Sequence, residues 1–115
     1  MWTFVTTLWW LLAAHAVTDF ALQDDRMIEL KNPTLTTLAE RPTYGPWWWW
    51  MLAHGLINGA GVGWVTGSAA LGALETVAHI NLDLMKCQRH IGRDIDQLGH
   101  VLYKVLWAVC VAWNR

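Results

Sequence analysis

The stretch "PWWWWMLAHGLINGAGVGWVTGSAALGAL" (Pro46–Leu74) decides the fold, because His54 is its only ionisable side chain. The uncharged run begins at Pro42 and is too long for one membrane-spanning helix, which needs about 20 residues. Glycines and a serine in "GWVTGS" (Gly63–Ser68) interrupt the apolar pattern. The stretch therefore predicts two apolar helices joined by a short turn.

Apolar runs also lie on both sides of this pair. Residues 1–18 hold no Asp, Glu, Lys or Arg, and they lack the small-residue cleavage site of a signal peptide. We therefore expect an all-α, integral membrane four-helix bundle that forms a single transmembrane domain over residues 1–115. The alternative is a soluble, very apolar helical bundle, since the third helix holds Glu75, His79 and Asp83. The expected helices cover residues about 2–23, 46–64, 68–86 and 95–113.

The composition agrees with a membrane protein. Of the 115 residues, 55% are hydrophobic, only 15% are charged, and ten are tryptophan. The net charge of −1 gives no basic excess, so we expect no nucleic-acid partner. Cys87 and Cys110 have neither zinc-ribbon nor disulfide-framework spacing, and we expect both to be free thiols.

Basic side chains are concentrated on one side of the expected bundle. Two loops, at about 24–45 and 87–94, and the helix end before the second hold nearly all of them. By the positive-inside rule these loops face the cytoplasm, both termini lie on the non-cytoplasmic side, and the protein is a multi-pass protein of the bacterial inner membrane. Trp47–Trp50 then form an aromatic belt at the cytoplasmic interface. The basic residues are Arg26, Lys31, Arg41, Lys86, Arg89 and Arg93.

Every expected helix carries polar side chains at four-residue steps. Because an α-helix has 3.6 residues per turn, positions four apart share one face. The first helix therefore presents His15, Asp19 and Gln23 together. The other faces hold His54 and Asn58; Glu75, His79 and Asp83; and Asp96 and His100, with Gln97 beside them.

One histidine from each helix falls at the same depth. Each lies six to eight residues from the cytoplasmic end of its helix, which is ~9–12 Å at ~1.5 Å per residue. A lone histidine in a membrane helix can be explained by a hydrogen bond to a neighbouring helix. A whole set of buried ionisable groups costs at least a few kcal/mol each unless they are paired or bind something. The pattern favours one polar cavity that opens to the cytoplasm.

Four segments resemble, in order, the phage and bacterial membrane proteins of the family called domain of unknown function 3307. They are "HAVTDFALQDDRM", "LAHGLIN", "LETVAHINLDLMKC" and "IDQLGH", and together they span nearly the whole chain. The resemblance implies an integral membrane protein, often phage-encoded, with no established activity. Asn58 stands where a second histidine of the second helix would be expected. The family motifs fall on His15, Asp19, Phe20, Gln23, His54, Glu75, His79, Asp83, Lys86, Asp96, Gln97 and His100.

One function that these residues suggest is metal-dependent hydrolysis, as in the more distantly similar membrane-bound metal-dependent hydrolases. Imidazoles and carboxylates would hold one or two divalent metals, with zinc, manganese or iron preferred to magnesium. The metal would activate water against an ester or phosphoester of a lipid headgroup. The expected ligands are His15, Asp19, His79 and Asp83; His54 and His100 are ligands or general acids and bases; Lys86 contacts an anionic substrate; and Gln23, Glu75, Asp96 and Gln97 orient the ligands.

The alternative function involves no catalysis. The polar core would then be structural or would relay protons or ions, and the protein would act through a host membrane protein. The outer halves of the helices hold few polar side chains, which favours a one-sided cavity over a channel. Gly55, Gly59 and Gly63 recur every fourth residue and predict close helix packing, within the chain or in an oligomer.

Overall fold

The computed structural model describes residues 2–34 and 44–114, and within them it is all-helical, as predicted. Arg41, one of the basic residues of the first expected loop, lies outside the described residues. The elements are α1 (Trp2–His15), the π-helical segment η1 (Ala16–Ala21), α2 (Asp25–Leu30), α4 (Trp47–Thr66), α5 (Ala69–Cys87) and α6 (Arg93–Trp113).

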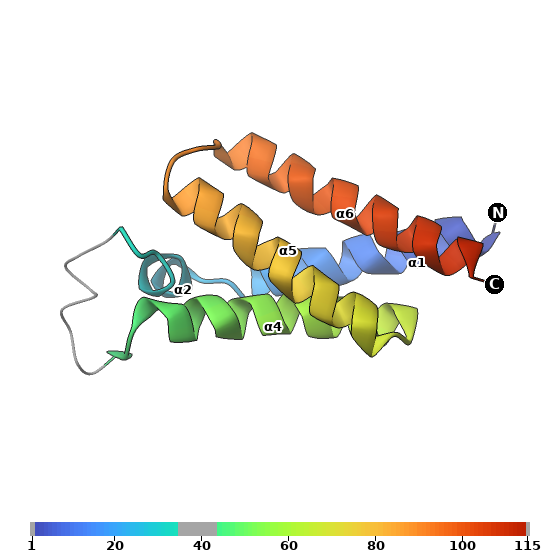
Figure 1. Cartoon of the computed structure of the whole chain (residues 1–115), viewed down its shortest axis with the longest axis horizontal. Helices are drawn as coiled ribbons and strands as arrows, with labels where there is room; N and C mark the ends of the chain where they lie inside the picture. The colour runs from blue at the N-terminus through green and yellow to red at the C-terminus, as the bar shows by residue number, and fades with distance from the viewer. Residues whose placement is uncertain (1, 35–43, 115) are drawn as a thin grey trace.

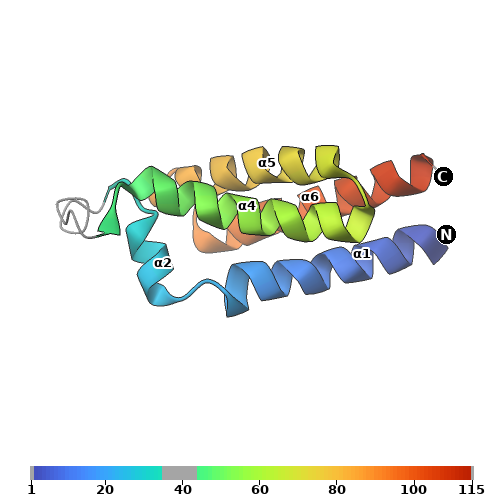
Figure 2. The same cartoon turned by 90° about the horizontal axis from the view of Figure 1, so that it is seen from below.

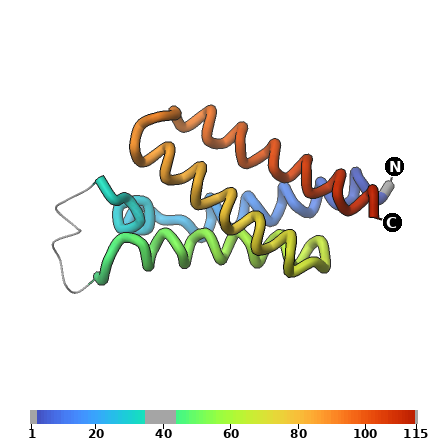
Figure 3. The backbone as a smooth tube through the Cα atoms, viewed as in Figure 1, coloured from blue at the N-terminus to red at the C-terminus, as the bar shows by residue number. Residues whose placement is uncertain are grey.

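The four long helices pack around a common interior (Figure 1). Both α1 and α5 contact α4 and α6, so that the four helices form a closed ring of neighbours. Chain direction alternates from one long helix to the next, which the tube in Figure 3 makes easy to follow. The two termini lie at one end, and α2 and the turn between α5 and α6 lie toward the other (Figures 1 and 2).

The predicted break in the apolar stretch is confirmed as a tight turn between α4 and α5. Gly67 has φ 68°, a left-handed conformation that glycine adopts without steric cost. The side chain of Ser68 then caps α5 by accepting a hydrogen bond from the backbone N–H of Leu71 at 3.2 Å. These two residues alone separate the helices.

The structure corrects two of the expected boundaries. The first helix does not continue regularly to Gln23, because α1 ends at His15 and is followed by π-helical turns. The loop expected from residue 24 contains α2, whose N-terminus is capped by Asp24 Oδ1 accepting from Met27 N at 2.8 Å. A helix of six residues is too short to show a periodic apolar pattern in the sequence.

Burial is reversed relative to a soluble protein. Within the described residues, twelve polar or charged side chains are buried, against eight hydrophobic ones. Large apolar side chains lie outside instead, among them Trp64 (90% exposed) and Trp113 (86%). A small apolar core of Leu11, Val62, Trp107 and Ala108 fills the bundle toward its terminal end. The interior is therefore mainly polar.

Two helical segments, Thr3–Ala21 and Arg93–Trp113, are long and apolar enough to cross a membrane. They correspond to the first and fourth expected spans. The second and third expected spans do not pass the same test, and the sequence explains why. The mean hydropathy of α4 is lowered by its tryptophans, glycines, His54 and Asn58, while α5 carries Glu75, Asp83 and Lys86.

Glycines allow α4 and α5 to approach closely. A Cβ atom at Gly59 would lie 2.0 Å from Thr76 Oγ1 and 2.5 Å from the carbonyl oxygen of Gly72. One at Gly55 would lie 2.6 Å from Ile80 Cγ1. The face that carries these glycines is thus occupied by α5 of the same chain.

We predict that Gly59→Ala lowers the stability of the protein. The added methyl group has to displace the backbone of α5, and overpacking of this kind costs about 1–3 kcal/mol. Gly61→Ala is the matched control, because its Cβ would meet only Ala14 Cβ at 3.5 Å and Thr18 Cγ2 at 3.6 Å. Thermal unfolding in detergent should show a lower Tm for Gly59→Ala and an unchanged or higher Tm for Gly61→Ala. Equal Tm values would contradict the close approach of α4 and α5.

Candidate metal centre

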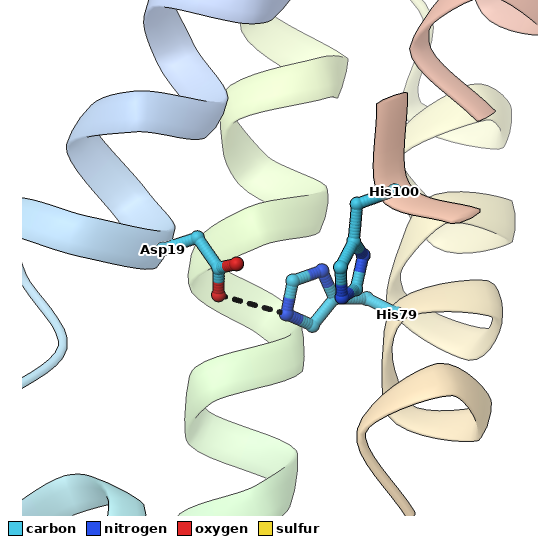
Figure 4. Close-up of side chains that lie close together, drawn as sticks. All are labelled: Asp19, His79 and His100. Atoms are coloured by element: carbon cyan, nitrogen blue, oxygen red, sulfur yellow. Dashed lines mark ion pairs between the residues drawn. The ribbon is translucent and has the colours of Figure 1, made fainter. Parts of the chain in front are cut away.

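Polar side chains from all four long segments converge in the interior of the bundle. Figure 4 shows three of them, with the carboxylate of Asp19 from η1 facing the imidazole of His79 from α5, and His100 from α6 beside it. The imidazole rings of His79 and His100 lie next to each other, with their centroids 4.1 Å apart. The imidazole of His54, from α4, lies on the other side of His79 at 4.8 Å.

Four donor atoms form the most compact group in this cluster. His54 Nε2 lies 3.0 Å from Asp19 Oδ1 and 3.0 Å from His79 Nε2. His79 Nε2 lies 3.4 Å from Asp19 Oδ1. Asp83 Oδ2 completes the group at 3.4 Å from His54 Nε2 and 3.7 Å from His79 Nε2. All four side chains are buried.

These separations are similar to those between neighbouring ligands of one metal ion. Zinc bonds to histidine nitrogen and carboxylate oxygen measure about 2.0–2.2 Å, which places neighbouring ligand atoms about 3.3–3.6 Å apart in tetrahedral geometry. The five separations range from 3.0 to 3.7 Å. An ion bound here by all four atoms would have to displace the ammonium group of Lys31 from Asp83 Oδ2.

The contacts of His54 Nε2 are crowded. This nitrogen lies 3.0 Å from both Asp19 Oδ1 and His79 Nε2, so a single N–H on His54 would have to be shared between two acceptors. A cation between the three atoms would instead be contacted by a lone pair from each of them.

A second group lies on the other side of Asp83. Asp83 Oδ1 and Asp96 Oδ1 lie 3.5 and 3.3 Å from His100 Nε2. All three atoms are buried, and none of them forms a hydrogen bond with a described residue, so the His100 ring meets the two oxygens only at ion-pair distance. Buried polar atoms usually form a hydrogen bond or bind an ion.

Two lysines partly neutralise the carboxylates. Lys31 Nζ, which follows α2, donates to Asp83 Oδ2 and to Gln23 Oε1. Lys86 Nζ lies 3.2 Å from Asp96 Oδ2 and 3.8 Å from Asp83 Oδ1. Lys86, which was expected to contact an anionic substrate, faces these two carboxylates in the structure.

Two further side chains hold the donors in place. Gln97 Nε2 donates to Asp19 Oδ2 at 3.1 Å, which leaves Oδ1 directed at the histidines. Glu75 lies behind His79, with Oε1 at 3.6 Å from Nδ1 of the ring. Carboxylates in this position commonly orient metal-binding histidines. Glu75 is itself held by Lys104 Nζ and by Trp107 Nε1, which donates at 2.6 Å.

Three of the four expected ligands lie together, and His15 is the exception. Asp19, His79 and Asp83 are in the four-donor group, and its fourth member is His54 rather than His15. His15 Nε2 instead contacts Gln97 Oε1 at 3.2 Å and lies 3.8 Å from Asp19 Oδ2. The π-helical turns begin directly after His15, so Asp19 does not follow His15 with the geometry of a regular α-helix, and the two side chains meet through Oδ2 rather than Oδ1.

Two buried lysines were missed by the sequence reasoning. Lys31 was assigned to a basic loop, and nothing in the local pattern indicates that it is 1% exposed. Lys104 was overlooked although a signal existed, because it continues the four-residue series of Asp96 and His100. The complete stripe of α6 is thus longer than predicted.

Comparison with known proteins identifies a family and no nearer relative. A family model described as "Protein of unknown function (DUF3307)" matches residues 7–114. The match includes all the side chains of the cluster. A search among curated proteins found no match. A search among solved structures found none either.

We predict that Lys104→Met strongly destabilises the protein, because Glu75 would remain buried without its cation. Removing one partner of a buried ion pair costs about 3–5 kcal/mol, whereas replacing both is often nearly neutral. The double variant Lys104→Met/Glu75→Gln should therefore recover most of the loss. Equilibrium unfolding in detergent of wild type, both single variants and the double variant measures the coupling. Additive losses would show that the two side chains are not paired.

Proposed function

This chain belongs to the DUF3307 family, and we propose that it is a membrane protein that binds a divalent metal ion between its four long helices. The ligands in this proposal are Asp19, His54, His79 and Asp83. Zinc, manganese or iron suits such a mixed nitrogen and oxygen set better than magnesium does. The observation that carries the proposal is the meeting of two imidazole nitrogens with a carboxylate oxygen at 3.0–3.4 Å inside the bundle.

The distribution of side chains supports insertion into a membrane. Exposed apolar side chains cover the outside of the helices, and the buried groups are largely ionisable. A lipid environment accommodates this arrangement, since polar groups of membrane helices face the bundle interior. In this proposal α4 and α5 also span the membrane, as part of a four-helix, multi-pass protein of the inner membrane. Their glycine-mediated contact is typical of membrane helices.

The chemistry that best fits the centre is hydrolysis. A bound divalent metal lowers the pKa of its water and polarises the ester or phosphoester that is attacked. A pocket of about 270 Å³ beside the centre is lined in part by Lys31, Lys86 and Arg89. Its positive charge suits an anionic headgroup, and the end of the bundle on which it lies is the one expected to face the cytoplasm. We therefore propose a lipid headgroup or another phosphoester as the substrate.

A second candidate function has one observation in its favour. Because Lys31 and Lys86 already contact Asp83, the carboxylates have cationic partners without a metal. The polar core would then be structural or would pass protons along its chain of imidazoles. A phage-encoded protein of this kind would act by binding a host membrane protein. Metal content separates the two functions.

We predict that His79→Ala loses bound metal while the protein still inserts. His79 supplies one ligand among several, so its loss should reduce zinc affinity at least tenfold, by analogy with the ~10–100-fold cost of losing a supporting residue. His90→Ala is the matched control, since His90 is exposed and outside the cluster. The measurement is zinc content by mass spectrometry after equilibrium dialysis of the purified proteins in detergent. Wild-type protein without metal above background, or equal metal in all three proteins, would refute the proposed centre.

The proposed topology makes a separate prediction. An alkaline phosphatase fused at residue 115 should be active, because this enzyme requires export from the cytoplasm. A fluorescent protein that folds only in the cytoplasm should not fluoresce when it is fused at the same position. Fusions after His90, in the turn between α5 and α6, should show the reverse. A cytoplasmic C-terminus would overturn the orientation and, with it, the cytoplasmic opening of the centre.

A further inference from the structure

We propose that the centre holds two metal ions and that Asp83 bridges them. The inference rests on the proposed function and adds a second site on the side of Asp83 that faces α6. Its ligands are Asp83 Oδ1, Asp96 Oδ1 and His100 Nε2. The first ion remains with Asp83 Oδ2 and the other three donors of its group.

The two oxygens of Asp83 point to different sets of donors. Oδ2 lies 3.4 Å from His54 Nε2 and 3.7 Å from His79 Nε2. Oδ1 lies 3.5 Å from His100 Nε2, and these two atoms form a compact group with Asp96. A carboxylate between two donor sets is the usual bridge in centres whose metals are about 3.5–4 Å apart.

The three donor atoms of the second site are all buried. Asp83, Asp96 and His100 are all 0% exposed, and these three donor atoms have no hydrogen-bond partner among the described residues. They nevertheless converge, with Oδ1 of Asp96 3.3 Å from His100 Nε2. Two buried carboxylate oxygens that face one imidazole nitrogen without a hydrogen bond form a donor set that a cation can occupy.

The two sites differ in whether a coordination position remains free for water or substrate. The first has four protein donors and is closed in the manner of a structural zinc site. The second has three, so that a water molecule or a substrate oxygen can take a fourth position. The second ion is therefore the one placed to activate water.

The lysines that now contact Asp83 have room to withdraw. Lys31 and Lys86 both line the 270 Å³ pocket described above. When ions replace their ammonium groups at the carboxylates, both lysine side chains can turn into this pocket, where an anionic headgroup would neutralise their charge. The same movement would place a phosphoester next to the open position of the second ion.

Metal stoichiometry tests the second site. The full-length protein in detergent is stripped with a chelator, loaded with Mn²⁺ and freed of excess metal, and manganese per chain is measured by mass spectrometry. Wild type and the control His90→Ala should bind two ions per chain, and His100→Ala should bind one. Electron paramagnetic resonance should show a coupled manganese pair in wild type and an isolated ion in His100→Ala. Asp96→Asn, which keeps the size of the side chain, is the second variant and should also bind one.

The outcomes are distinguishable. One ion per chain in wild type, unchanged in His100→Ala and Asp96→Asn, would overturn the second site and leave the proposed function intact. Two ions in wild type and in both variants would overturn the assignment of these ligands. Protein that binds no manganese and no zinc would overturn the second site together with the proposed function.

Discussion

The structure depends on how the charge of Asp83 is met inside the bundle. This carboxylate is completely buried, and it is surrounded by side chains from α4, α5 and α6 and by Lys31, which follows α2. Burial of a carboxylate without partners would lower the stability of the fold by several kcal/mol, and the cost would be larger for a bundle surrounded by lipid than for one surrounded by water. The helices are therefore held to positions from which lysine and histidine side chains reach one point. Whatever the protein does, its interior is organised around this requirement.

Helix packing sets the distances within the centre. Glycines at positions 55 and 59 leave room for the Ile80 and Thr76 side chains of α5 against the surface of α4, and the rings of His54 and His79 lie 4.8 Å apart across this contact. On the opposite side, the π-helical turns of η1 direct Asp19 toward the same two histidines. Irregular helical turns of this type are common at functional sites. Local backbone choices and the chemistry of the centre are thus parts of one arrangement.

The sequence was sufficient to predict the four long helices and which of their faces are polar. Four-residue spacing identified Asp19, His79 and Asp83, and the shared depth of the histidines predicted that they would lie together. It was not sufficient to choose between His15 and His54 as the neighbour of Asp19, because a π-helical turn leaves no periodic signal. The sequence also did not indicate the burial of Lys31, because Lys31 is buried by its contact with Asp83, a residue far away in the chain. Spacing along a helix predicts faces, whereas contacts between elements need the tertiary structure.

X-ray absorption at the zinc edge tests the central claim, which is that histidine and carboxylate groups of this bundle bind a divalent metal. The account predicts that purified, zinc-loaded protein shows only nitrogen and oxygen neighbours at about 2.0–2.2 Å, with the outer-shell scattering of imidazole rings. It also predicts no sulfur neighbour near 2.3 Å, because neither Cys87 nor Cys110 belongs to the cluster. A sulfur shell, or a spectrum of hydrated zinc without imidazole scattering, would contradict the account.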